Sequence, residues 1–221
     1  MHKKILPPLS ILILILFISC KKNVCPPDKK LGDLDLRSAT LEFNPYSGNE
    51  KLVFKNTVGD SLILLAPDGK KVTRDQLCIK TICTEPKIKG NSTCEYFGSE
   101  THRFIFRDDA QTTLMDLLFF SEVYEENTQK FYSMMRVGFS TGNYISQAST
   151  VTDIQFSENF LESKTGVNQF LMEKNSIILN GKEFTNILAA EEDAVKYYYS
   201  KTQGLIGFKT PDATWNLDRV E

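Results

Sequence analysis

Short turns between apolar segments are the feature that most limits the folds open to this chain. Asn180-Gly181 separates residues 176–179 from residues 182–188, and this dipeptide is the preferred two-residue turn of a β-hairpin. Pro67-Asp68-Gly69-Lys70 is a second strong turn, because proline pre-sets φ and glycine accepts a positive φ. Parallel neighbours need a crossover of about a dozen residues or more. Successive strands joined by turns this short therefore cannot be a parallel pair.

Strand candidates recur along the whole chain as short alternating or aromatic-rich segments. They cover residues 51–55, 61–65, 76–84, 94–107, 112–124, 130–139, 176–179, 182–188, 195–200, 205–209 and 214–220. The stretch 153–174 spaces its apolar residues as a helix would, but Gly166 interrupts it. We therefore predict a mainly β protein, an antiparallel meander of about ten strands. It forms a sandwich or a partly open barrel, with at most one or two short helices.

The N-terminus has the layout of a secretory signal. His2, Lys3 and Lys4 are followed by an apolar run that Ser10 alone interrupts, and small Ser19 ends it. This order of charged, apolar and small residues is typical of a signal peptide. Residues 9–19, as a helix, would reach about 16 Å into a hydrocarbon core of ~30 Å. The run is thus too short to span a bilayer.

Phe17-Ile18-Ser19-Cys20 resembles the lipobox of bacterial lipoproteins. The resemblance implies cleavage before Cys20, a diacylglycerol thioether on its sulfur and acylation of its new amine. It divides the chain into a signal peptide (1–19), a lipidated tether (20–32) and a single β-rich domain (33–221). No aspartate follows Cys20, which by the same resemblance favours the outer membrane. The absence of an acidic cluster there favours the periplasmic face, with surface exposure as the alternative.

The C-terminal stretch 197–220 resembles the ending of uncharacterised outer-membrane lipoproteins of Gram-negative bacteria. The shared features are a tyrosine strand, a glycine-flanked apolar strand and a closing Trp-x-Leu strand, here with Trp215 and Leu217. This likeness supports the compartment and the β fold, and it implies no activity.

Four cysteines remain once Cys20 is assigned to lipid, and behind a signal peptide they meet an oxidising compartment. Four cysteines allow three pairings. Cys83 and Cys94 enclose ten residues, so we expect a disulfide between them, with Cys25 and Cys78 as the leftover pair. Zinc is the rival interpretation, but Cys78-x4-Cys83 lacks a second close Cys or His pair. No metal or cofactor is therefore predicted.

The sequence gives little support for a catalytic site. Gly138-Phe139-Ser140-Thr141-Gly142 matches the nucleophile elbow, but that mechanism needs a histidine later in the chain. His102, the only histidine after the signal, precedes Ser140 and is expected to line the edge of the core. Acidic residues occur in runs, which we interpret as solvated loops, with a glycosidase pair as the alternative. These runs are Asp108-Asp109, Glu125-Glu126 and Glu191-Glu192-Asp193.

The run Tyr197-Tyr198-Tyr199 is the one aromatic cluster that could bind a ligand. Successive residues of a strand alternate between its two faces. We expect one core ring flanked by two rings on the outer face; the alternative is a platform that stacks on carbohydrate.

The net charge of the chain limits the classes of binding partner that can be expected. Without residues 1–19 the chain has 24 basic and 28 acidic residues, so nucleic acid is not an expected partner. The leading hypothesis is a non-catalytic, membrane-anchored module that binds a ligand or partner in the envelope. The alternatives are a lipid- or lipoprotein-handling half-barrel and an envelope glycan hydrolase.

Replacing the lipidation site gives the first testable prediction. Cys20→Ser should abolish fatty-acid labelling and move the protein to the soluble fraction, because no thioether can form. Ser10→Ala, within the same signal, should label and sediment with membranes as the wild type does. A Cys20→Ser protein that still labels and sediments would show that the anchor is something else.

Overall fold

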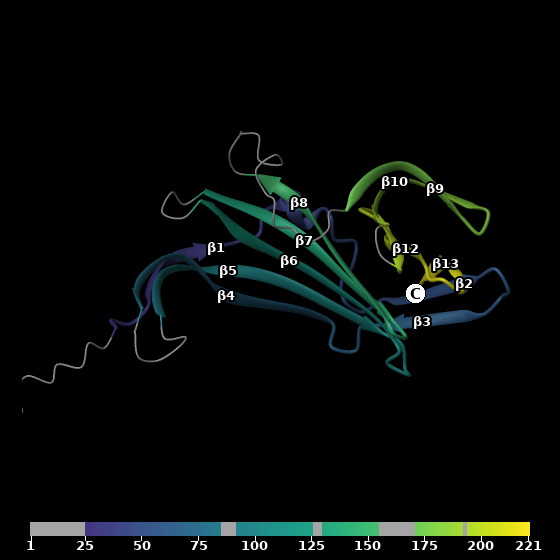
Figure 1. The fold of residues 1–221 in the computed structure, drawn as a ribbon, viewed down its shortest axis with the longest axis horizontal. Helices are drawn as coiled ribbons and strands as arrows, with labels where there is room; N and C mark the ends of the chain where they lie inside the picture. Colours follow the sequence, from purple (N-terminus) through teal and green to yellow (C-terminus); the bar gives the residue numbers. More distant parts are fainter. Residues whose placement is uncertain (1–24, 85–91, 126–129, 155–170, 192–193) are drawn as a thin grey trace, which may run out of the picture.

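The computed structural model describes residues 25–84, 92–125, 130–154, 171–191 and 194–221, which form one sheet (Figure 1). Its first half comprises β1 (Lys29–Leu34), β2 (Lys51–Asn56), β3 (Ser61–Leu65), β4 (Lys70–Thr84), β5 (Ser92–Arg107), β6 (Thr113–Glu125) and β7 (Lys130–Thr141). The second half comprises β8 (Tyr144–Ile154), β9 (Met172–Leu179), β10 (Lys182–Ala190), β11 (Lys196–Ser200), β12 (Gly204–Lys209) and β13 (Thr214–Val220). The helix α2 (Ser38–Leu41) has only four residues.

The predicted mainly β fold is confirmed as a curled half-barrel, and the sheet has thirteen strands where about ten were expected. The strands follow the order β8-β7-β6-β5-β3-β2-β13-β12-β11-β10-β9, with β1 and β4 also paired to β5. In Figure 1 the long strands β4 to β8 form a fan, and the β9–β10 hairpin arches on the other side. All pairs are antiparallel except β1 with β5, which is parallel.

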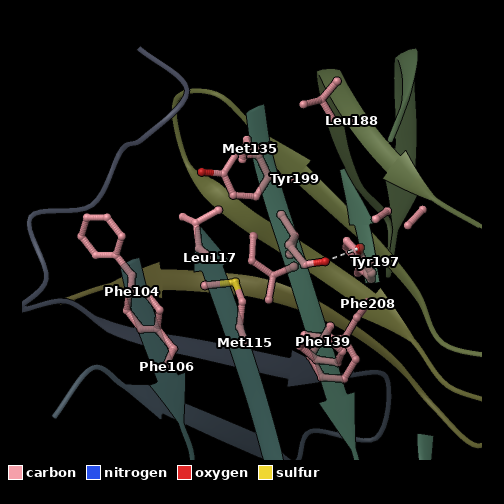
Figure 2. Close-up of a cluster of buried hydrophobic side chains, with 14 of the residues drawn as sticks. Phe104, Phe106, Met115, Leu117, Met135, Phe139, Leu188, Tyr197, Tyr199 and Phe208 are labelled. Atoms are coloured by element: carbon pink, nitrogen blue, oxygen red, sulfur yellow. Dashed lines mark hydrogen bonds between the residues drawn. The ribbon is translucent and has the colours of Figure 1, made fainter. Parts of the chain in front are cut away.

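The main core lies where the two parts of the sheet face each other. On β6 every second side chain is fully buried: Met115, Leu117 and Phe119. This period of two is what a strand with one buried face requires. Figure 2 shows Met115 and Leu117 with Phe104 and Phe106 of β5, opposite the aromatic rings of β11 and β12. The sheet therefore curls because its two halves bury one apolar surface together.

The tyrosine strand β11 supplies rings to both of its faces. Tyr197 and Tyr199 enter the main core, and Tyr198 enters a second buried cluster with Leu179 and Ile206. The expectation of one core ring with two on an outer face is wrong. Because the sheet continues past β11 and curls, both faces of this strand are covered.

The hydroxyls of the core tyrosines are matched with backbone groups. Tyr197 donates to the carbonyl oxygen of Val137 at 2.8 Å, as the dashed line in Figure 2 marks. Tyr199 donates to the carbonyl oxygen of Phe43 at 2.7 Å. Burying a hydroxyl without such a bond is costly. These two bonds thus fix β11 against β7 and against the segment after α2.

Part of the segment that was expected to be a tether, residues 20–32, belongs to the sheet. Lys29–Leu34 is strand β1, in parallel register with β5 from Glu95 to Ser99. The domain therefore begins before residue 33. In the stretch 153–174, where one helix was the alternative, residues 155–170 lie outside the described part of the chain. The rest of it belongs to β8 and β9 apart from Leu171.

Gly204, at the start of β12, lies against the phenol of Tyr46. It has a φ of +75°, and a Cβ added to it would lie 1.8 Å from the Tyr46 oxygen. That oxygen accepts a hydrogen bond from the backbone N–H of Leu205 at 2.7 Å. Burial raises the pKa of Tyr46 above its ordinary value, so the phenol stays protonated.

Gly204→Ala should lower the free energy of unfolding by about 3–5 kcal/mol, because left-handed strain adds to overpacking against Tyr46. Gly181→Ala is the matched control, since Gly181 has a φ of +79° and nothing lies within 4 Å of its added Cβ. Gly181→Ala should lower the free energy of unfolding by only about 1–2 kcal/mol. Urea unfolding measures the free energy of unfolding of both variants. Equal losses of stability would contradict the role given to the contact between Gly204 and Tyr46.

Candidate functional site

A groove of about 430 Å³ lies on the outer face of β4, β5, β6 and β7. It is lined by basic side chains (Lys71, Arg103, Arg136), hydroxyl side chains (Thr73, Ser99, Thr101, Ser121), Asp75, Gln76 and apolar side chains (Leu77, Leu118, Phe120). Arg103, Leu118 and Arg136 alternate with core residues along β5, β6 and β7, which places them on the opposite face of the sheet.

The register of the sheet explains why the basic side chains meet there. Lys71 lies opposite Arg103, Arg103 opposite Leu118, and Leu118 opposite Arg136. Residues directly opposite each other in a sheet share a face. Three cations from β4, β5 and β7 thus stand in one row across four strands, although 65 residues separate the first from the last.

Arg136 is the cation of this row that no acid neutralises among the residues that the structure describes. Its guanidinium lies over the ring of Phe120, 5.5 Å from the centroid. Arg103, by contrast, makes two hydrogen bonds to Asp116, at 2.8 and 2.6 Å. Lys71 forms an exposed ion pair with Asp68 at 3.3 Å. The donors of Arg136 are therefore the ones left for a ligand.

Ser99 is the second distinctive group. Its side chain lines the groove and is 4% exposed, and within the described part of the chain its hydroxyl has no hydrogen-bond partner. Thr101, two residues further along β5, is also buried. A buried hydroxyl without a partner costs about 1–3 kcal/mol. Such a group at a groove wall is what a polar ligand would satisfy.

His102 lies on the core side of β5, away from the groove, as expected for the edge of the core. Its Nε2 is 2.9 Å from Glu100 Oε1, and the other carboxylate oxygen accepts the backbone N–H of Leu36 at 2.9 Å. Burial raises the pKa of Glu100, but these two hydrogen bonds outweigh it, so the pKa is lowered overall. The pair ties the segment after β1 to β5.

The other candidate catalytic groups do not converge. Ser140 lies near the end of β7, opposite Ile145 of β8. It is therefore part of the end of the β7–β8 hairpin. Asp108 accepts hydrogen bonds from Thr112 and Thr113 in the turn between β5 and β6. Glu191 accepts a hydrogen bond from the Tyr198 hydroxyl at 3.1 Å. Asp109 is exposed, and Glu125 ends β6; residues 126 and 192–193 lie outside the described part.

The disulfide connects Cys25 to Cys83, with 5.6 Å between their Cα atoms. The expected pairs Cys83–Cys94 and Cys25–Cys78 are therefore wrong. Cys83 lies opposite Thr93 in the β4–β5 register. Opposed residues share a face and consecutive residues alternate, so Cys94 points away from Cys83. The short loop between them suggested a crosslink that the register of the sheet prevents. Cys20 lies outside the described residues, and its lipidation stays a prediction.

Comparison with protein-family models, with curated proteins and with solved structures finds no match for this chain. In the described residues, no helix has the length and apolar character needed to cross a membrane. The same residues contain no group of three or more acidic, cysteine or histidine side chains placed to bind a metal ion.

Sequence reasoning did not single out the groove. Arg136 and Ser99 carry no motif, and the only signal was their place as polar residues alternating with apolar ones in long strands. That pattern predicts a solvated face. It does not predict that four strands would bring these particular side chains together.

Ser99→Ala should raise the free energy of unfolding by about 1 kcal/mol, because it removes a buried hydroxyl that has no partner. Ser146→Ala should do the same, since the Ser146 hydroxyl is also buried without a partner but does not line the groove. Chemical denaturation checks both. A loss of stability in Ser99→Ala would mean that the native hydroxyl is satisfied in solution.

Proposed function

We propose that this protein is a non-catalytic envelope lipoprotein whose groove binds a polyhydroxylated ligand carrying an anionic group, such as an acidic glycan. One observation carries the proposal: in one groove, the Arg136 guanidinium has no acidic partner and the buried Ser99 hydroxyl has no hydrogen-bond partner among the residues that the structure describes. The anchor would be Cys20 in the outer membrane, with the domain facing the periplasm and surface exposure as the alternative.

The ligand class follows from the chemistry of the lining. An arginine fork binds carboxylate or phosphate through two parallel hydrogen bonds. The hydroxyls of Thr73, Ser99 and Thr101 complement sugar hydroxyls, and Leu118 and Phe120 form an apolar floor for the face of a sugar ring. The groove also falls within the usual range of small-molecule sites, about 300–1,000 Å³. It spans several strands, so an extended ligand suits it better than a single ion.

Lipid handling receives less support, because that function needs an apolar cavity that stays open. The concave face of the half-barrel is filled by the main core, in which Phe104, Leu117 and Tyr199 are fully buried. A glycan hydrolase needs two carboxyl groups about 5–9 Å apart across a sugar. Among the described lining residues Asp75 is the one carboxylate, and it accepts hydrogen bonds from the Thr73 hydroxyl. Asp116 of β6 is bonded to Arg103.

The disulfide supports a domain that stays close to its anchor. Cys25 is fastened to the end of β4 through Cys83. If Cys20 carries the lipid, four residues lie between it and that fixed point, and the five Cα-to-Cα steps reach at most about 18 Å. The proposed ligand is therefore one that lies within the layer next to the membrane.

Binding of defined oligosaccharides tests the function. The mature chain in detergent micelles should bind uronate- or phosphate-bearing oligosaccharides and should not bind the neutral sugars of the same length. Arg136→Gln should weaken binding about 10-fold or more, because a charge-assisted hydrogen bond contributes about 1.5–3 kcal/mol. Isothermal titration calorimetry provides the affinities.

The controls separate the groove from general effects of charge. Arg219→Gln removes an exposed arginine on β13 that is paired with Asp218 and Glu221, so it should leave affinity unchanged. Ser99→Ala should weaken binding and Ser146→Ala should not. Equal binding of neutral and acidic sugars would contradict the ligand class. Cleavage of the glycan during the titration would favour the hydrolase.

A further inference from the structure

The four cysteines of the domain gather at the end of β4 and β5 that lies near β1. Cys25 and Cys83 form the disulfide, and Cys78 and Cys94 are free. Cys78 lies opposite Tyr96, so Cys94 occupies the diagonal position on the neighbouring strand and on the same face. The sheet register shifts between Cys78 and Lys80. Cys94 is close enough to Cys78 to contribute to the raised pKa of the Cys78 thiol.

The surroundings of the two thiols hold one sulfur in place and leave the other accessible. Cys94 is buried, its backbone N–H donates to Asp28 at 2.7 Å, and the side-chain amide of Gln76 donates to its sulfur at 3.3 Å. Cys78 is exposed to solvent. An external reagent would therefore reach Cys78 first, and Cys94 would be positioned to react next.

We propose that Cys78 and Cys94 form a second disulfide when the chain meets a disulfide oxidant. The Cys78 thiolate attacks the oxidant, forms a mixed disulfide and releases the first thiol of the oxidant. The Cys94 thiolate then attacks the sulfur of Cys78, closes the Cys78–Cys94 bond and releases the second thiol. Two thiol protons leave the protein, and two electrons reduce the oxidant to its dithiol form.

The chemistry of Cys78 favours a structural crosslink over a catalytic thiol. Desolvation first, and then the neighbouring Cys94, raise the pKa of Cys78 to about 11. A catalytic or redox-sensing cysteine has a lowered pKa, because the thiolate is the reactive form. A disulfide here would join β4 to β5, and β5 is the only neighbour of β4 in the described sheet. The crosslink would thus secure an edge strand.

Counting thiols in the full chain tests the proposal independently of where the protein resides. The purified chain is incubated with oxidised glutathione, denatured and alkylated with a maleimide. We expect no free thiol at Cys78 or Cys94 and a Cys78–Cys94 crosslinked peptide in a non-reducing digest. Two alkylated cysteines at these positions, or a Cys83–Cys94 peptide, would overturn the proposal.

Two variants complete the test. Cys25→Ser/Cys83→Ser should still lose the thiols of Cys78 and Cys94 to the oxidant, which shows that the second pair reacts on its own. Cys78→Ser/Cys94→Ser should lower the Tm of the oxidised protein by about 5–10 °C, because a closed loop of this length is lost. An unchanged Tm would contradict the structural role. If a variant fails to fold, the thiol count of the wild-type chain still decides.

Discussion

The whole architecture depends on one sheet having to cover its own apolar face. The chain has no helix longer than four residues among those described, so no other layer is available to bury the rings of β5, β6 and β7. The sheet solves this by curling until β11 and β12 pack on them, and Phe139 and Phe208 meet with ring centroids 4.7 Å apart. Hydrophobic burial provides the driving force, and the tyrosine hydroxyls bonded to backbone carbonyls fix the orientation.

That curl also determines where a ligand could bind. The concave face is filled by the side chains of the main core, whereas the groove that Arg136 lines is on the outer face. On the outer face, the long strands β4 to β7 bring Arg136, Phe120 and Ser99 into one surface. The strands are rigid and regularly paired, which keeps these groups at fixed spacings. A binding site of this kind needs no mobile loop to form.

The cysteines show how far loop length alone can mislead. Ten residues separate Cys83 from Cys94, which made a crosslink look easy. The disulfide instead spans 58 residues, from Cys25 to Cys83. The parallel pairing of β1 with β5 carries the start of the chain past the end of β4, and this pairing left no signal in the sequence. The β4–β5 register places Cys78 beside Cys94.

The sequence by itself determined the local structure and the expected cellular location. Asn180-Gly181 forms the predicted turn between β9 and β10, with Leu179 opposite Lys182, because turn geometry depends on the residues of the turn. The order of charged, apolar and small residues before Cys20 is likewise a local signal. Only the tertiary structure decided that Tyr197 and Tyr198 are both buried, which cysteines bond, and that Lys71, Arg103 and Arg136 stand in a row. These features depend on which distant strands become neighbours. That choice is made by the burial of the whole apolar face, and no short segment encodes it.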